Sequence, residues 1–129
     1  MKLRKQLSVF LENKPGILAR VASAFSRRKV NILAISVSDA VGYCVLRLLV
    51  DKTDKAKSIL KSQGLKAVEE SVVAGEVTNK IGSLASLSAK LARAKVNIDF
   101  VYGSASSSQK SSFLVFGTCA NPKAAKVLK

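Results

Sequence analysis

The sequence predicts an α+β protein that contains two tandem copies of one unit, each running strand, helix, strand, strand, helix. The first observation behind this is a repeat: residues 12–18 (ENKPGIL) return as residues 78–84 (TNKIGSL), an offset of 66 residues. Ten of the 20 positions in residues 13–32 recur unchanged at that offset, which indicates a duplicated structural unit. The second observation is a change of apolar period, from alternation before the first repeated segment to helical spacing after each one.

The first strand is predicted over residues 6–12. Leu7, Val9 and Leu11 alternate there with other residues, the period of a half-buried strand. The basic residues 2–5 that precede it are expected to be a frayed lead.

The repeated segment predicts a tight loop followed by an amphipathic helix. Pro15 fixes its own φ and has no N–H, so it suits a first helical turn, and Gly16 lets the backbone pass close to another group. Helices are predicted over residues 15–28 and 82–94, with apolar residues at i, i+3, i+4 and i+7 and a basic last turn.

The rest of the first copy follows from turn and cap residues. A strand, a turn, a second strand and a helix are predicted over residues 31–38, 39–42, 43–50 and 53–61. Thr53 or Asp54 is expected to cap this helix and Gly64 to end it.

A long extended stretch over residues 65–78 joins the copies. It is too short for two strands and a free linker, so we expect one long bent strand or two fused ones. Gly75 marks either a bulge or a close approach. The predicted domains are residues 1–70 and 71–129.

The second copy is predicted to repeat the first without a closing strand. Strands are expected over residues 97–103 and 112–118, with a polar hairpin loop over residues 104–111. Asn121 is expected to cap a last helix that has Pro122 at its first position. A sheet edge would then stay open for a partner chain.

Composition limits the function classes. The chain has 22 Lys and Arg against 8 Asp and Glu, a net charge of +14, and no His. This charge favours an acidic partner, but the basic residues are scattered, as on solvated Lys-rich helix faces. No apolar stretch is long enough for a membrane span and no secretory h-region is seen, so we expect a cytoplasmic protein with no membrane contact.

Catalytic and metal chemistry are not expected. Cys44 and Cys119 occupy non-equivalent positions in or beside apolar runs, which favours buried free thiols over a disulfide. With no His and no cysteine pair at metal spacing, no metal or other cofactor is expected. The acidic residues form no recognisable acid/base pair and the cysteines have no evident base, so an enzyme is not expected.

The order of elements, the Asn-Lys-Pro-Gly loop and the following Val-Asn-Ile resemble the ACT domain, and the duplication resembles stand-alone tandem ACT proteins that bind amino acids. The resemblance covers nearly the whole chain, although Ile81 stands where the family has Pro. It implies ferredoxin-like βαββαβ units, with helices on one face of an antiparallel sheet, that pair side by side in a homodimer.

The resemblance also implies a ligand site. Small effectors, usually amino acids, lie in that family between the loop of one domain and the second strand of its neighbour. Carried over, this implies Asn13, Lys14, Pro15, Gly16, Ile17, Leu18, Asn31, Ile32, Asn79, Lys80, Ile81, Gly82, Ser83, Leu84, Asn97 and Ile98. Backbone groups at residues 16–18 would hold the amino-acid head group, and Asn31 or Asn97 would bond it from the partner. The same residues also fit a plain helix start and a strand-start turn without a ligand.

Three functions stay open. The first is a non-catalytic sensor that binds an amino acid and regulates an enzyme. The second is a basic ferredoxin-like nucleic-acid-binding module, which is less favoured because base-stacking aromatics are sparse on the central strands. Only Tyr43 stands there in the first copy, and Phe113 and Phe116 in the second could equally be core. The third is a structural oligomerisation module.

Overall fold

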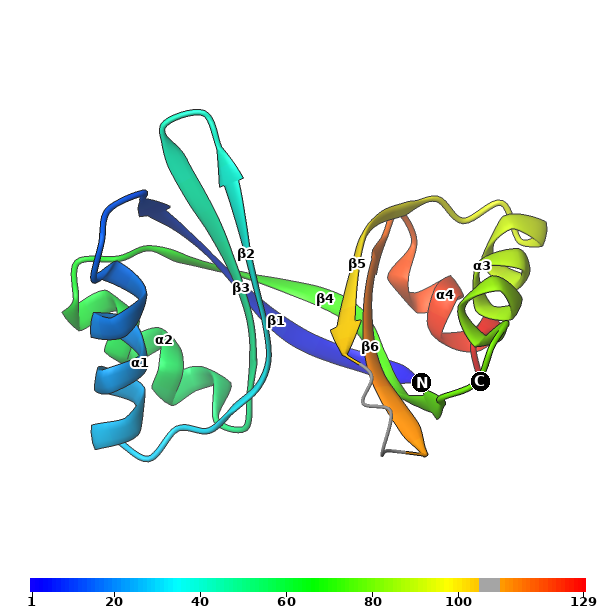
Figure 1. The fold of residues 1–129 in the computed structure, drawn as a ribbon, viewed down its shortest axis with the longest axis horizontal. Helices are drawn as coiled ribbons and strands as arrows, with labels where there is room; N and C mark the ends of the chain where they lie inside the picture. Colours follow the sequence, from blue (N-terminus) through cyan, green and yellow to red (C-terminus); the bar gives the residue numbers. More distant parts are fainter. Residues whose placement is uncertain (105–109) are drawn as a thin grey trace. The chain divides into compact units, whose positions relative to one another are not determined.

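A computed structural model describes residues 1–104 and 110–129 (Figure 1). The helices and strands are β1 (Lys2–Glu12), α1 (Ile17–Arg27), β2 (Ile32–Ala40), β3 (Tyr43–Val50), α2 (Thr53–Ser62), β4 (Ala67–Thr78), α3 (Ser83–Arg93), β5 (Ile98–Ser104), β6 (Ser111–Thr118) and α4 (Asn121–Val127). Residues Lys5–Glu70 form one compact unit, called the first unit, and Met1–Arg4 with Ser71–Lys129 form the second unit. Most of the predicted hairpin loop over residues 104–111 lies outside the described residues.

Each unit is a sheet with its helices on one face, as predicted. The strand order is β2-β3-β1-β4 in the first unit and β1-β4-β6-β5 in the second. The pairs β1–β3, β2–β3, β4–β6 and β5–β6 are antiparallel. Helices α1 and α2 cover one face of the first sheet, and α3 and α4 cover one face of the second (Figure 1). The predicted α+β fold of two ferredoxin-like units is confirmed.

Strand β4 serves both units, which confirms the expectation of one long strand. Its 12 residues run without interruption, the first four in the first unit and the rest in the second. Gly75 marks a close approach and not a bulge, because it pairs in regular register with Leu114. A Cβ at Gly75 would lie 3.1 Å from the Cα of Met1.

The N-terminal residues correct two expectations. Residues 2–5 are not frayed, since β1 begins at Lys2 and Met1–Arg4 belongs to the second unit, next to β4. Met1 packs against that unit's core, and its ammonium donates to the Leu128 carbonyl at 3.4 Å. The chain's own N-terminus therefore occupies the edge that was expected to stay open, and the oligomerisation hypothesis loses the feature that motivated it.

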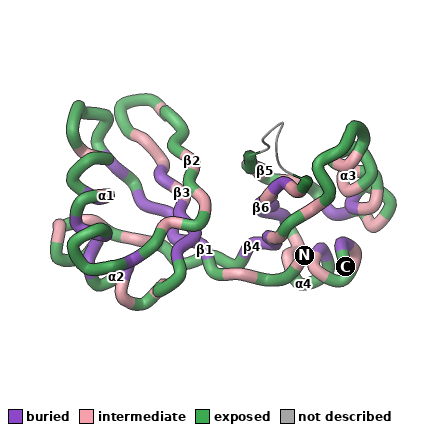
Figure 2. Tube along the Cα trace, turned by 60° about the horizontal axis from the view of Figure 1, so that its bottom comes forward, coloured by how far each residue is buried: buried purple, intermediate pink, exposed green. Residues whose placement is uncertain are grey.

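Each unit has its own hydrophobic core, and the buried residues gather on the strands (Figure 2). Leu7, Leu46 and Phe25 are fully buried in the first unit. Leu91 and Phe116 are fully buried in the second. These clusters join the apolar stripe of the helices to the apolar face of the strands. In β1 the alternating polar residues Gln6 and Ser8 are buried as well, so burial there does not follow the predicted half-buried pattern.

The two cysteines fit the expectation in part. Both thiols are free, but Cys44 is half-buried and Cys119 is exposed. Cys119 accepts a hydrogen bond from the Asn97 amide at 3.4 Å, because the two residues meet where the end of β6 passes the start of β5. In the described part of the chain, no helix is long and apolar enough to cross a membrane.

The helix caps differ from those expected. Neither Thr53 nor Asp54 caps α2: Lys52 holds the cap position, without a side-chain hydrogen bond. Asn121 is the first residue of α4 and not its cap. The side-chain oxygen of Asn121 instead accepts a hydrogen bond from the backbone N–H of Thr118 at 2.9 Å. Its side-chain NH₂ group donates to the Ser71 carbonyl at 2.6 Å, so Asn121 ties the end of β6 to β4.

Candidate functional site

The two repeated loops have the same backbone geometry. Gly16 and Gly82 are the N-cap residues of α1 and α3, with φ of 88° and 92°. A Cβ built at either position would have no atom within 4 Å, so close packing is not the reason for the glycine. The reason is the left-handed backbone conformation, which glycine adopts without strain. Pro15 lies in the turn before α1 and not in its first helical turn, and Asn13 does not cap the helix.

Matching hydrogen bonds hold the two loops. Lys14 and Lys80 each donate their amide to the carbonyl two residues earlier, at 3.0 Å. The carbonyls of Gly16 and Gly82 accept the first helical bonds, at 3.0 and 2.9 Å. In the second loop the Ser83 amide also donates to the Lys80 carbonyl, at 3.2 Å. The N–H groups that follow at the start of each helix suit a carboxylate.

The side chains of the first loop are engaged by acidic neighbours. Asn13 donates its side-chain amide to Asp39 at 3.1 Å. Lys14 lies 2.6 Å from the Glu12 carboxylate. The hydrogen bond and the charge of Lys14 lower the pKa of Glu12 below its ordinary value.

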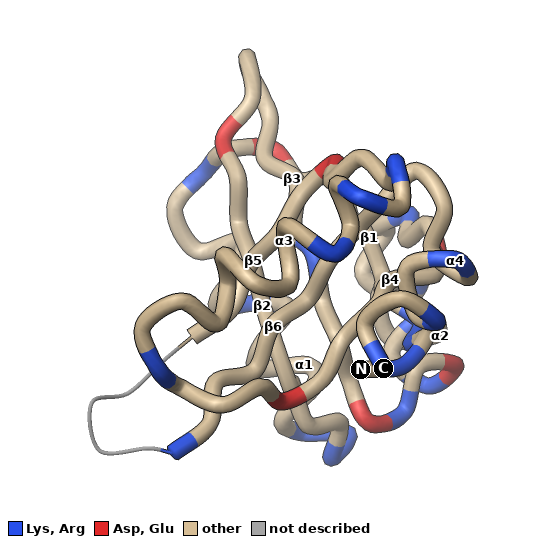
Figure 3. Tube along the Cα trace, turned by 90° about the vertical axis from the view of Figure 1, so that its right-hand side faces the viewer, with Lys and Arg blue, Asp and Glu red and all other residues tan. Residues whose placement is uncertain are grey.

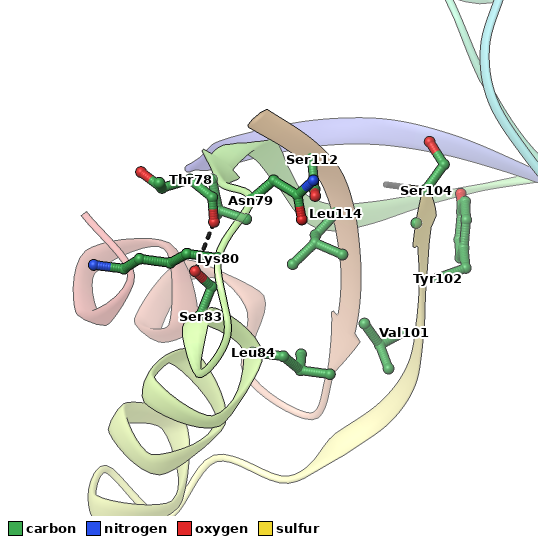
Figure 4. Close-up of a pocket in the computed structure, with 12 residues that line it drawn as sticks. Thr78, Asn79, Lys80, Ser83, Leu84, Val101, Tyr102, Ser104, Ser112 and Leu114 are labelled. Carbon is green, nitrogen blue, oxygen red and sulfur yellow. Dashed lines mark hydrogen bonds between the residues drawn. The ribbon is translucent and has the colours of Figure 1, made fainter. Parts of the chain in front are cut away.

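The second loop is held differently. Ser83 donates its hydroxyl to the Thr78 carbonyl at 2.6 Å (Figure 4). The backbone amide of Asn79 donates to the Lys110 carbonyl at 2.9 Å. Lys80 forms no ion pair with a described residue. The equivalent of Glu12 in this copy is Thr78, so the loop carries no local carboxylate.

The predicted asparagines before β2 and β5 have structural partners within the chain. The Asn31 amide donates to Asp51 at 2.9 Å, and its carbonyl accepts from the Asp51 amide at 3.1 Å. Asn97 bonds its own neighbour Asp99 through the side chain at 3.1 Å. These contacts agree with the strand-start role and leave the ligand role a prediction.

The second unit has a cavity of about 360 Å³ beside its loop (Figure 4). Its lining consists of Val77, Thr78, Asn79, Lys80, Ser83, Leu84, Val101, Tyr102, Gly103, Ser104, Ser112 and Leu114. Four of the predicted site residues are therefore brought together: Asn79, Lys80, Ser83 and Leu84. Asn97 and Ile98 are not part of this lining, and Ile98 packs against the core.

The residues on the floor of this cavity were not among those predicted from the sequence. Val101, Gly103, Ser112 and Leu114 come from β5 and β6, on the face of the sheet that α3 covers. The repeat was the available signal: Val101, Gly103 and Ser112 differ from their first-copy equivalents, whereas Leu114 matches Leu46.

The features expected of a nucleic-acid surface are weak. Phe116 is fully buried in the core, and Tyr43 packs against Phe10 with the ring centroids 5.8 Å apart. The basic residues are spread over helices and loops and do not follow one strand (Figure 3).

The fold and the paired glycine-capped loops define a duplicated βαββαβ protein. The chain belongs to the family described as the ACT domain pair, whose model matches residues 1–129. This confirms the resemblance inferred from the loops and the repeat.

Solved structures share this fold. A protein from Bacteroides thetaiotaomicron is 29% identical with a TM-score of 0.90, covering 98% of this chain and 86% of that chain. The ligand-free regulatory subunit of aspartate kinase from Thermus thermophilus has a TM-score of 0.69 at 18% identity, covering 99% of this chain and 93% of that one. At that identity the second likeness shows the fold alone.

A curated relative is also a subunit of an enzyme. The probable acetolactate synthase small subunit of Archaeoglobus fulgidus is 32% identical over 78 residues, which is 59% of this chain and 48% of that protein. The chain thus spans less than half the length of this relative. The present chain is an ACT domain pair, and it is similar to proteins named as regulatory or small subunits of enzymes.

Proposed function

We propose that this chain is a non-catalytic regulatory module that binds an amino acid at ACT domain interfaces and acts in the cytoplasm on an enzyme partner. The observation that carries the proposal is the pair of glycine-capped loops, at φ 88° and 92°, with matching backbone hydrogen bonds. The curated relative named as a probable acetolactate synthase small subunit supports a partner that is an enzyme.

The chemistry of the loops supports an amino-acid effector. The carboxylate would be bound by the backbone N–H groups at the start of α1 or α3, where the helix dipole favours negative charge. In a homodimer the second strand of a neighbouring domain would close the site, with Asn31 and Ile32 or Asn97 and Ile98. An effector that prefers one assembly state then shifts the equilibrium between states, which is how binding becomes regulation.

A thermal-shift screen of the 20 common amino acids tests the proposal, followed by calorimetry and light scattering with each amino acid that raises Tm. A ligand at about 100 times its Kd adds roughly 2.7 kcal/mol to the free energy of unfolding. We expect a shift with one or a few amino acids that persists at high salt. No binding of any amino acid at millimolar concentration would refute the proposal.

The same screen tests the nucleic-acid alternative, which the charge of +14 motivates. A short RNA and a short DNA are included at low and high ionic strength. A shift with nucleic acid alone that disappears at high salt, as counterion release requires, would replace the sensor function.

A further inference from the structure

A second cavity lies in the first unit, apart from the repeated loops. Its volume is about 580 Å³, and its lining consists of Lys57, Ser58, Lys61, Gly64, Leu65, Lys66 and Ala67. One wall is the second half of α2, and the other is the segment that leads from α2 into β4 (Figure 1). This described lining contains none of the residues implied for an amino-acid site.

Both walls are fixed by the core of the first unit. Ile59 and Leu60 of α2 are buried, and Leu65 and Ala67 of the opposite wall pack against the same core. The Leu65 amide donates to the Leu60 carbonyl at 2.9 Å, which joins the two walls at the turn. The outline of the cavity is therefore set by packed segments of the backbone.

The turn after α2 also weakens an obstacle to anion binding. The end of a helix carries partial negative charge on its unbonded carbonyls. At the end of α2, the carbonyls of Ile59, Leu60 and Lys61 all accept backbone hydrogen bonds, at 3.2, 2.9 and 3.0 Å. These oxygens are bonded within the turn, so they oppose an anion less than the bare end of a helix would.

The cavity carries an excess of positive charge. Lys57 and Lys61 lie one helical turn apart and share one face of α2, and Lys66 comes from the opposite wall. Among the described residues, none that lines the cavity is acidic, and neither Lys61 nor Lys66 forms an ion pair with any of them. Three like charges around one cavity repel one another, and an anion between them offsets that repulsion.

One carboxylate lies close by but does not take the place of such an anion. Glu69 is 3.8 Å from the Lys57 ammonium through one oxygen and 3.8 Å from the Lys5 ammonium through the other. Because two lysines share this carboxylate and it does not line the cavity, it offsets only part of the charge of Lys57.

The second copy shows that the fold does not require the lysine at position 57. When α2 and α4 are aligned at their first residues, the buried Leu60 matches the buried Leu128, and Lys57 matches Ala125. The core face of the helix is therefore kept in both copies, whereas the lysine that borders the cavity belongs to the first copy alone.

The chemistry of the lining fits a phosphate group. Each lysine ammonium binds phosphate as a point charge with three donors, and the Ser58 hydroxyl adds one more donor. The described lining has no aromatic side chain on which a nucleic-acid base could stack. The volume lies within the range of about 300–1,000 Å³ that is typical of ligand pockets, which leaves room for an organic group or a second phosphate.

We propose that the first unit binds a small phosphorylated compound in this cavity, with Lys57, Lys61 and Lys66 around the phosphate. The site goes beyond the proposed function, since it differs from the amino-acid site in both position and ligand chemistry. A chain with both sites responds to two classes of small molecule.

Titrations of the full chain in a phosphate-free buffer test the site. The probes are pyrophosphate, glycerol 3-phosphate and inorganic phosphate, with sulfate and a short RNA as comparisons. We expect calorimetry to show submillimolar binding of pyrophosphate or glycerol 3-phosphate that weakens as salt is added. In NMR, the backbone amide signals of Gly64 and Leu65 should shift on titration, whereas those of Gly16 and Gly82 in the repeated loops should stay in place.

Two variants of equal charge test the cause. The first replaces the cavity lysines: Lys57→Gln, Lys61→Gln and Lys66→Gln. It should lose about tenfold or more in affinity, because three charge-assisted contacts are removed. The matched control takes the same charge from the helices of the second unit: Lys90→Gln, Lys123→Gln and Lys126→Gln. Its affinity should change by less than about twofold. If Tm falls in the first variant, the single charge reversal Lys61→Glu at an exposed side chain gives the same test.

Three results would overturn the inference. The first is equal loss of affinity in the two triple variants, which would mean that phosphates respond to the net charge of +14 and not to the cavity. The second is no binding of any small phosphate at millimolar concentration. The third is RNA binding that depends on the cavity lysines without binding of a small phosphate, which would assign them to nucleic acid. The proposed function is tested separately, because the cavity variant should give the same amino-acid screen as the wild type.

Discussion

Replacing Gly82 by Ala separates the loop's conformation from its role in binding. The backbone at Gly82 has φ 92°, and an added Cβ would contact nothing within 4 Å, so the cost is purely conformational. An L-residue in the left-handed region costs about 1–2 kcal/mol. The gain of about 0.4–1 kcal/mol that Gly→Ala can give through the unfolded chain applies only where the native φ suits Ala, and φ 92° does not. We therefore expect a loss of roughly 1–2 kcal/mol in the free energy of unfolding, with Tm lowered by at least about 4 °C for a unit of this size.

Two matched variants complete the design. Gly16→Ala makes the same change in the first loop, and Gly64→Ala makes it after α2, at φ 75° with no Cβ contact. All three variants should lose similar stability in thermal unfolding. Calorimetry with the amino acid that gives the largest thermal shift should show weaker binding for a loop variant, Gly16→Ala or Gly82→Ala, and unchanged binding for Gly64→Ala.

Two results would contradict this reasoning. Unchanged Tm in Gly82→Ala would mean that the loop does not need a left-handed residue. Equal loss of affinity in Gly64→Ala and Gly82→Ala would mean that binding follows global stability and not the loop.

Two further predictions concern single residues. Lys29 and Lys95 follow equivalent helices with φ of 59° and 58°, so Lys29→Gly and Lys95→Gly should each stabilise by up to about 1 kcal/mol in urea unfolding. Arg28→Gly, at φ −96°, should destabilise instead. Lys14 lowers the pKa of Glu12 from 4.5, so this pair stabilises the fold above that pH and the gain is lost as the pH falls through the lowered pKa. The Tm difference between wild type and Glu12→Gln should therefore vanish in acid, and a difference that persists there would refute the pairing.

The fold could be predicted because the sequence contains two copies of one unit, which can be aligned with each other. The repeat of Asn13 at Asn79 and of Gly16 at Gly82 fixed the register of two units without any structure. The change from alternation to helical spacing then set the type of each element, and most bounds agree to within two residues. The left-handed lysines after α1 and α3 also repeat, so local backbone detail follows the duplication.

The N-terminal strand was missed because its signal is not local. Lys2 and Arg4 make the segment look like a solvated tail, yet basic residues are also common on edge strands, which they protect from further pairing. What orders Met1–Arg4 is the second unit, whose own copy ends without a closing strand. The contact between Met1 and Gly75 joins residues far apart in the sequence. The glycine at position 75 could not be linked to Met1 without the structure.

The cap predictions failed for a related reason. Asn121 was expected to cap α4, and Asn13 before α1 has the same type of side chain, which often caps helices. Each instead bonds a partner that only the fold provides. Asn13 donates to Asp39 at the end of β2, and Asn121 bridges β6 to β4 through Ser71. Glycine could take the cap position before α1 because the left-handed turn, and not a side chain, sets the direction of the helix.

The residues of the candidate site fall into two groups, those that are identical in the two copies and those that differ. Positions that are identical in the copies, such as Gly16 and Gly82, carry the backbone geometry, which any duplicate of the fold needs. Positions that differ decide what the geometry is used for. Ile17 and Val37 correspond to Ser83 and Gly103. Ser83 lines the cavity beside the second loop, whereas Gly103 allows a close approach of Phe113 and Leu114 that a Cβ would block. The loop backbone therefore comes with the duplicated fold, and the surroundings of each loop depend on the positions that differ.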